Sequence, residues 1–179
     1  TRLKVLRLGG NHELKLIPQE IFNLPHLTEL TLPGFETAIP PQIGELGSLE
    51  ILGIVSGSLK TLPEAIANCT NLTELYVNLT RLQELPAGIG KLINLRKLHL
   101  WNITFEPSNL LPPQISRLWN LRELHILGHK IKFLPPEIGE LCNLTELTMI
   151  GAGLDELSPE IGRLDKLEQL HIAGCNFSV

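Results

Sequence analysis

Apolar and polar residues follow two different periods within residues 134–149, which read LPPEIGELCNLTELTM. Residues 144–149 form an L-x-x-L-x-L frame whose end alternates apolar and polar side chains, as a half-buried strand does. The preceding half spaces its apolar residues three apart, which is typical of a short helical turn. Pro135 or Pro136 suits the first helical position, and Glu137 suits the positive end of the turn. The stretch therefore predicts a tight helical turn, a bend and a strand.

The same unit recurs along the whole chain. The first leucine of the strand frame returns at intervals of 24, 22, 23, 23, 26, 23 and 23 residues. The proline that opens each helical turn returns with it, shifted by one residue only in the last repeat. The leading leucines are Leu3, Leu27, Leu49, Leu72, Leu95, Leu121, Leu144 and Leu167, and the turns open at Ile17-Pro18, Ile39-Pro40, Leu62-Pro63, Leu85-Pro86, Leu111-Pro112, Leu134-Pro135 and Leu157-Ser158.

A period of about 20 to 29 residues with L-x-x-L-x-L is the signature of leucine-rich repeats. All 179 residues resemble the short LPxxIxxLxxL type of this family, so we expect one domain of about eight repeats. The resemblance implies an α/β fold: a right-handed, curved horseshoe solenoid with a parallel sheet on its concave side. Short helical or 3-10 turns would form the convex side. Repeats of this type occur in Ras-associated scaffolds, plant intracellular immune receptors and bacterial effectors.

Two features depart from the family pattern. The family places an asparagine after the strand to bond the backbone of neighbouring turns, and here only Asn11 matches. The aligned residues are Phe35, Gly57, Thr80, Ile103, His129, Ala152 and Cys175. The repeat that begins at Leu95 also carries three extra residues around positions 105–109, where a functional loop and a tolerated insertion are equally good interpretations.

A single repeat cannot bury its own apolar face, so each needs a neighbour on both sides. We see no polar capping module at either end of the chain. We therefore expect the 179 residues to be part of a longer protein, and the isolated chain to associate end to end or to fray.

Composition narrows the function only slightly. The net charge of −4 is mild and dispersed, which gives no sign of nucleic-acid binding. We find no membrane-length apolar run and no signal peptide. Cys69 takes a core leucine position, Cys175 takes the after-strand position and Cys142 lies beside a core leucine, so we expect packed, inert thiols and a cytoplasmic location.

Six Asn-x-Ser/Thr sequons keep a secreted protein open as an alternative. Two of them, Asn71 and Asn143, fill the position before the strand that Asn94 and Asn120 also occupy, so a structural role explains them. The remaining sequons are Asn68, Asn78, Asn102 and Asn176.

The residues between the leucines of each strand form three columns on the concave face, because parallel strands stack about 4.8 Å apart. Tyr76, Trp101, Leu127 and Ile150 converge at the middle of this face, where a solvated strand needs no large apolar residues. Such a patch usually marks an interaction surface. We expect Trp101 to be substantially exposed and Trp119 to lie where the helical turn meets the strand. The predicted partner-binding residues are Tyr76, Asn78, His99, Trp101, His125, Leu127, Thr148 and Ile150.

His99 and His125 sit in adjacent repeats near Glu123 and Glu146. This arrangement has two interpretations, a metal site and a surface histidine pair. The pair is the better interpretation, because zinc needs three or four placed ligands and His171 is two repeats from His125. The pair would make partner binding pH-dependent. We therefore predict no metal and no cofactor.

No motif carries catalysis: the chain has no glycine-rich phosphate loop and no Cys/His pair at nucleophile spacing. We predict a non-enzymatic recognition domain that binds a protein partner on its concave face. Two alternatives remain: the targeting domain of a larger enzyme, such as an effector ubiquitin ligase, and a secreted, glycosylated receptor ectodomain.

Overall fold

The structure is a computed structural model of the 179-residue chain. It describes residues 1–11, 14, 16–34, 38–55, 59–78, 81–82, 84–101, 111–128 and 131–176. The insertion around 105–109, the sequon Asn102 and five of the after-strand positions (Phe35, Gly57, Thr80, Ile103 and His129) lie outside these residues.

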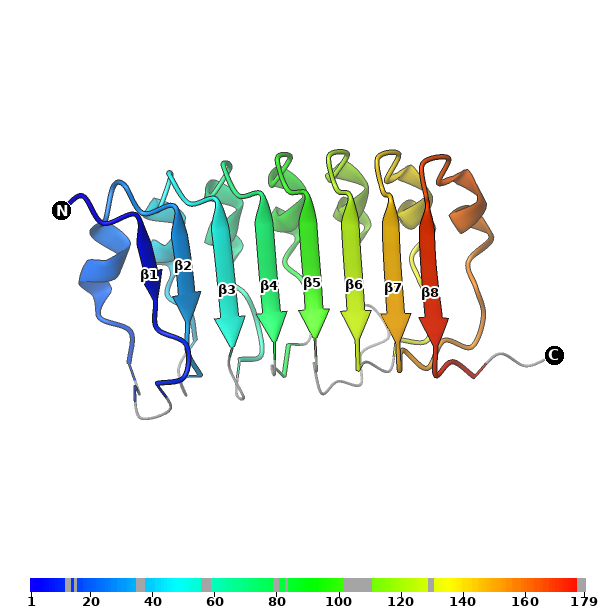
Figure 1. The fold of residues 1–179 in the computed structure, drawn as a ribbon, viewed down its shortest axis with the longest axis horizontal. Coiled ribbons are helices and arrows are strands. Elements are labelled where there is room, and N and C mark those ends of the chain that lie inside the picture. The colour runs from blue at the N-terminus through cyan, green and yellow to red at the C-terminus, as the bar shows by residue number, and fades with distance from the viewer. Residues whose placement is uncertain are drawn as a thin grey trace.

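Within the described residues, eight strands form one parallel sheet in sequence order. Figure 1 shows them side by side in an uncurled sheet, with β1 and β8 at the two edges. Each strand coincides with one predicted L-x-x-L-x-L frame. The strands are β1 (Val5–Arg7), β2 (Glu29–Leu32), β3 (Ile51–Val55), β4 (Glu74–Asn78), β5 (Lys97–Trp101), β6 (Glu123–Leu127), β7 (Glu146–Ile150) and β8 (Gln169–Ala173).

Seven short 3-10 helices run along the other side of the sheet, one between each pair of strands (Figure 1). They are η1 (Gln19–Asn23), η2 (Pro41–Glu45), η3 (Glu64–Asn68), η4 (Ala87–Lys91), η5 (Pro113–Arg117), η6 (Pro136–Glu140) and η7 (Pro159–Arg163). Proline fixes φ near the helical value at their starts. The shifted proline, Pro159, still opens η7, as predicted.

The core lies between these two layers. Leu98 and Leu100 of β5 point into it and are fully buried, as are Leu95 before the strand and Ile89 of η4. Equivalent residues of neighbouring repeats stack on them and form one continuous apolar cluster. This is the solenoid that the repeat pattern predicts.

Asparagines before the strands form a hydrogen-bonded ladder that the sequence analysis missed. The Nδ2 atom of Asn94 donates to the carbonyl of Thr70 in the preceding repeat at 2.9 Å. Asn71, Asn120 and Asn143 make the same bond, to Gly47, Ile93 and Trp119, at 2.7, 2.7 and 2.6 Å. This ladder precedes the strand; after the strand, Asn11, the one residue that matches the family's asparagine, donates to the carbonyl of Leu8 at 2.8 Å.

Of the three cysteines, only Cys69 matches its predicted packing role in full. It is completely buried and its thiol donates to the carbonyl of Ile43 at 3.3 Å. Burial raises the pKa of the Cys69 thiol to about 11, which keeps it protonated and unreactive at neutral pH. The expectation that Cys142 is packed is wrong: its side chain is exposed, in the turn between the buried Leu141 and Leu144.

The last repeat shows what stacking contributes. Leu170 of β8 is 40 % exposed, whereas its partner Leu147 in β7 is fully buried. The two leucines hold the same position in the repeat and differ in having one or two neighbouring repeats. Burial of a given leucine therefore depends on the repeat next to it as much as on its own.

A glycine in the middle of most 3-10 helices allows neighbouring helices to approach closely. A Cβ atom at Gly139 would lie 2.7 Å from the carbonyl oxygen of Glu160 in the next repeat, nearer than packed atoms come. The same is true at Gly44 and Gly90, whereas Gly162 in η7 has nothing within 4 Å. At Gly44, Gly90 and Gly139 the missing side chain leaves room for the next repeat, whereas η3 and η5 hold Ala67 and Ser116 at the equivalent position.

We predict that Leu98→Ala lowers the free energy of unfolding by about 2 to 5 kcal/mol, because it opens a cavity in the packed core. Leu170→Ala, at the equivalent and partly exposed position, should cost clearly less. Urea titration of both variants provides the measurement. Equal losses, or a loss below about 1 kcal/mol for Leu98→Ala, would mean that burial by the next repeat does not govern stability.

Gly139→Ala and Gly162→Ala form a second matched pair. The first should destabilise the chain by about 1 to 3 kcal/mol, because the new methyl group meets a neighbouring carbonyl. The second should be neutral or slightly stabilising, because alanine favours the helical backbone and meets no atom. Thermal unfolding followed by circular dichroism tests both, and a harmless Gly139→Ala would contradict the tight approach of the helices.

Candidate functional site on the sheet face

Strand pairing determines which side chains share the sheet face, meaning the side of the sheet opposite the 3-10 helices. Tyr76 pairs with His99 and His99 pairs with His125, in the register that the sequence predicts. The three predicted columns are therefore observed. Across β4 to β8 they read Glu74, Lys97, Glu123, Glu146, Gln169; then Tyr76, His99, His125, Thr148, His171; then Asn78, Trp101, Leu127, Ile150, Ala173.

The eight predicted partner-binding residues lie together on β4 to β7, but their exposure differs. Ile150 is the most exposed of them at 47 %, and His99 and Thr148 are buried at 7 % each. The others are half-buried: Tyr76, Asn78, Trp101, His125 and Leu127.

Trp101 is half-buried, so the expectation that it is substantially exposed is wrong. It points away from the leucine core as predicted, but it leans on its neighbours in the column of Tyr76 and His99. Its ring centroid lies 5.3 Å from that of His99 and 6.3 Å from that of Tyr76. Trp119, by contrast, is 52 % exposed in the turn after η5.

Four rings form one cluster at the middle of the sheet face. Tyr76 meets His99 edge to face at a centroid distance of 5.0 Å. The imidazoles of His99 and His125 stack at 4.0 Å with an interplanar angle of 8°. Such contacts stabilise aromatic pairs beyond the area they bury. Together with Trp101 these rings make a rigid apolar platform on β4, β5 and β6.

The predicted surface histidine pair is therefore wrong for His99 and correct for His125. His125 is partly accessible, but His99 lies beneath Tyr76, Trp101 and His125 and is largely removed from solvent. Burial lowers the pKa of His99, and the neighbouring His125 lowers it further, while Glu123 acts in the opposite direction. His99 is accordingly neutral at pH 7.

Three polar atoms of this cluster are buried and make no hydrogen bond within the described residues. They are both ring nitrogens of His99 and the indole nitrogen Nε1 of Trp101. A buried polar atom without a partner costs about 1 to 3 kcal/mol. Three such atoms in one place are therefore unusual for a surface that has only a structural role.

Carboxylates border the rings along the first column. The Tyr76 hydroxyl donates to Glu74 at 2.5 Å, and this bond, after burial, raises the pKa of Tyr76. His125 Nε2 lies 2.9 Å from Glu146 Oε1, and Lys97 Nζ lies 3.2 Å from Glu123 Oε1. Every carboxylate next to the rings is thus held by a neighbour.

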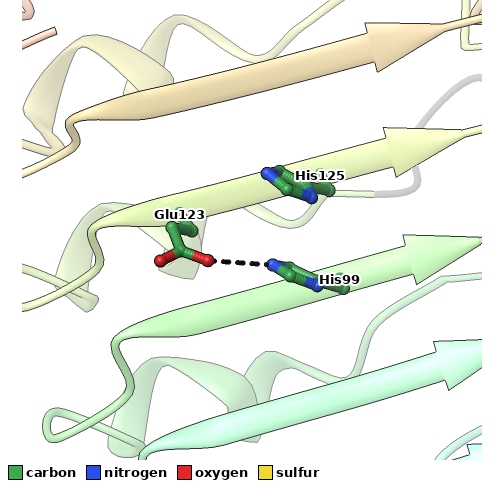
Figure 2. Close-up of side chains that lie close together, drawn as sticks. All are labelled: His99, Glu123 and His125. Atoms are coloured by element: carbon green, nitrogen blue, oxygen red, sulfur yellow. Dashed lines mark ion pairs between the residues drawn. The ribbon is translucent and has the colours of Figure 1, made fainter. Parts of the chain in front are cut away.

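One trio of side chains has the composition of a metal site. The ligand atoms of His99, Glu123 and His125 lie within 4.8 Å of one another. Figure 2 shows the two imidazoles one above the other on neighbouring strands, with the Glu123 carboxylate facing His99. His99 Nε2 is 3.4 Å from Glu123 Oε2, in a direction that makes no hydrogen bond.

Sequence placed Glu123 near His99 and His125, but the predicted partner-binding residues include neither Glu123 nor Glu74. The signal for them was present: both precede a sheet-face residue of the site by two positions, so they point to the same side. Their contacts with the rings depend on side-chain rotamers, which the repeat pattern does not specify.

A family described as a leucine-rich repeat region matches residues 1–126, more than half of the chain. A comparison with curated proteins found no match. Among the residues that the structure describes, none of the helices has the length and apolar character that a membrane crossing requires.

Solved leucine-rich-repeat structures match nearly the whole chain. A protein of Leptospira interrogans shares 30 % identity over 99 % of this chain and 50 % of its own, with a TM-score of 0.72. A structure described as a TDR receptor shares 27 % identity over 89 % of this chain and 28 % of its own, with a TM-score of 0.75.

A third structure was solved with a bound partner. It is the ectodomain of the plant membrane receptor kinase GASSHO1/SCHENGEN3 from Arabidopsis thaliana, in complex with CASPARIAN STRIP INTEGRITY FACTOR 2. It shares 28 % identity over 90 % of this chain and 20 % of its own, with a TM-score of 0.68. This chain therefore spans half the length, or less, of the three structures it resembles.

Proposed function

This chain belongs to the leucine-rich-repeat family, and we propose that its sheet face binds a protein or peptide partner with Trp101 at the centre of the contact. Repeats of this fold are generally binding modules rather than catalysts, because stacking creates a long continuous surface. The chain itself is thus a protein-interaction domain. The location of the contact on this face, and the role of Trp101, are the proposal.

The proposal rests on the indole nitrogen of Trp101, which is buried and makes no hydrogen bond within the described residues. Tryptophan donates a hydrogen bond and accepts none, so its buried Nε1 needs an oxygen acceptor. A backbone carbonyl of a bound chain supplies one. The half-buried ring around it gives the low-entropy, amphipathic contact that dominates many interfaces.

The residues beside Trp101 suit the same partner. Leu127 and Ile150 continue its column across β6 and β7, and Ile150 is 47 % exposed. Glu123 and Glu146 lie on the first column, separated from this apolar strip by His125 and Thr148. A partner segment with apolar side chains and flanking basic residues would match both features.

The domain's place in a larger protein has two candidates. Recognition by an intracellular protein agrees with the buried, unreactive thiol of Cys69 and with the structural use of the sequons Asn71 and Asn143. A receptor ectodomain is the second candidate, favoured by the resemblance to the plant receptor ectodomain solved with its partner. The full-length gene separates them, because a signal peptide and a membrane span would occur only with the second. A flanking catalytic domain would instead make this chain the targeting part of an enzyme.

Trp101→Ala tests the binding surface. Peptides selected from a displayed random library on the wild-type chain should lose about 2 kcal/mol or more of binding free energy to this variant. Fluorescence titration or calorimetry measures the change, and Trp119→Ala, in an exposed turn, is the matched control. Because Trp101 packs on His99, we expect some loss of stability, on the order of 1 kcal/mol.

A urea titration of the same variants separates binding from folding. Peptides that bind Trp101→Ala as tightly as wild type, or that lose affinity equally with Trp119→Ala, would show that the contact lies elsewhere. Trp101→Phe is a sharper second variant, since it keeps a ring but removes the unpaired nitrogen. It should weaken binding without lowering the urea midpoint.

A further inference from the structure

We propose that His99, Glu123 and His125 form a binding site for a divalent transition-metal ion of the zinc class. This inference is independent of the partner proposal, because all three ligands belong to this chain and their test needs no partner. It also reverses the expectation from sequence, which took the histidines for a surface pair.

The fold brings the three ligands together on rigid strands. His99 on β5 and His125 on β6 are direct register partners, so their Cα atoms are separated by about one strand spacing. Glu123 precedes His125 by two residues and therefore points to the same face of β6. Their ligand atoms already lie within 4.8 Å of one another without an ion (Figure 2).

The state of His99 is the second, separate observation. Its side chain is more than nine-tenths buried, and neither ring nitrogen makes a hydrogen bond within the described part of the chain. An ion would give one of these nitrogens a ligand bond where no described residue makes a hydrogen bond to it.

The ligand set suits zinc, with an adjustment of the rings. Zinc binds histidine nitrogen and carboxylate oxygen at about 2.0 to 2.2 Å, so ligand atoms in a tetrahedral site lie about 3.3 Å apart. The present spread must therefore contract, and the stacked imidazoles must turn so that both lone pairs face one point. The torsion between ring and Cβ is intrinsically broad, but His99 packs on Tyr76 and Trp101, so its rotation requires these neighbouring rings to adjust with it.

Glu146 and Lys97, which lie next to the trio, have opposite effects on metal binding. Glu146 Oε1 lies 2.9 Å from His125 Nε2, so it either orients that ring from behind or joins the ion as a fourth ligand. Lys97 Nζ lies 3.2 Å from Glu123 Oε1 and competes with a cation for that carboxylate. Removing the Lys97 charge should therefore strengthen metal binding, an effect that non-specific binding would not show.

The test is calorimetric titration of the chelator-treated 179-residue chain with Zn²⁺, together with the visible absorption of its Co²⁺ form. We expect one ion per chain, and Co²⁺ bands typical of nitrogen and oxygen ligands. His125→Gln and Glu123→Gln should each weaken Zn²⁺ binding by about tenfold or more. His171→Gln, in the same column but outside the trio, should leave it unchanged, and Lys97→Gln should strengthen it.

Circular dichroism and the melting temperature show that each variant is folded before its affinity is compared. Zinc should also raise the melting temperature of the wild type more than that of His125→Gln, because the ion stabilises the state it binds. Absence of binding, equal affinity of His125→Gln and His171→Gln, or a sulfur-to-cobalt charge-transfer band from the cysteines would each overturn the site.

Discussion

Contact between successive repeats is the interaction on which the rest of this structure depends. At the start of each strand, two successive amides bond to one carbonyl of the preceding repeat, as Thr73 and Glu74 do to Glu50. The asparagine ladder adds a side-chain bond beside them, and the glycines of the 3-10 helices let the outer layer follow at the same spacing. The contribution of a further repeat is clear at the strand leucines: Leu147 is fully buried between two repeats, whereas Leu170 in the last repeat is 40 % exposed.

Stacking of the repeats also determines which side chains meet on the sheet face. Because repeats stack in register, residues 23 or 26 positions apart become direct neighbours, and one residue type repeated in a column becomes a cluster. Tyr76, His99 and His125 meet for this reason alone. The strands that hold them are fixed by a fully buried core on the other side, so the rings are presented on a rigid support. Recognition on this face therefore costs little ordering of the protein.

The sequence predicted the features that follow from the repeat period. It did not predict those that depend on the rotamers of individual side chains. The eight strands, the helical turns and the three columns follow from the spacing of leucine and proline, and all are observed. The burial of His99 and Trp101 does not follow, because it arises when large rings in adjacent columns lean on one another. Alternation assigns a residue to a face of the sheet, but not its depth within that face. The asparagine ladder was missed for another reason: its position was recognised, but its acceptor lies in the preceding repeat, 24 residues away for Asn94.

The ring cluster contains buried nitrogens that make no hydrogen bond within the described residues, and their chemistry differs. Those of His99 bear on the metal proposal, and that of Trp101 bears on the partner proposal. A neutral imidazole has one nitrogen that accepts and one that donates, so an ion at His99 would occupy only the accepting nitrogen. The indole nitrogen of Trp101 is a donor and cannot bind a metal at all. An oxygen atom can satisfy it, and the half-buried Trp101 side chain lies beside the half-buried Leu127, with the exposed Ile150 next along the same column. Metal binding and partner binding therefore satisfy different atoms of one cluster, and neither makes the other unnecessary. An ion that turned the His99 ring would also move the surface against which Trp101 rests, so the two events would be coupled through that contact.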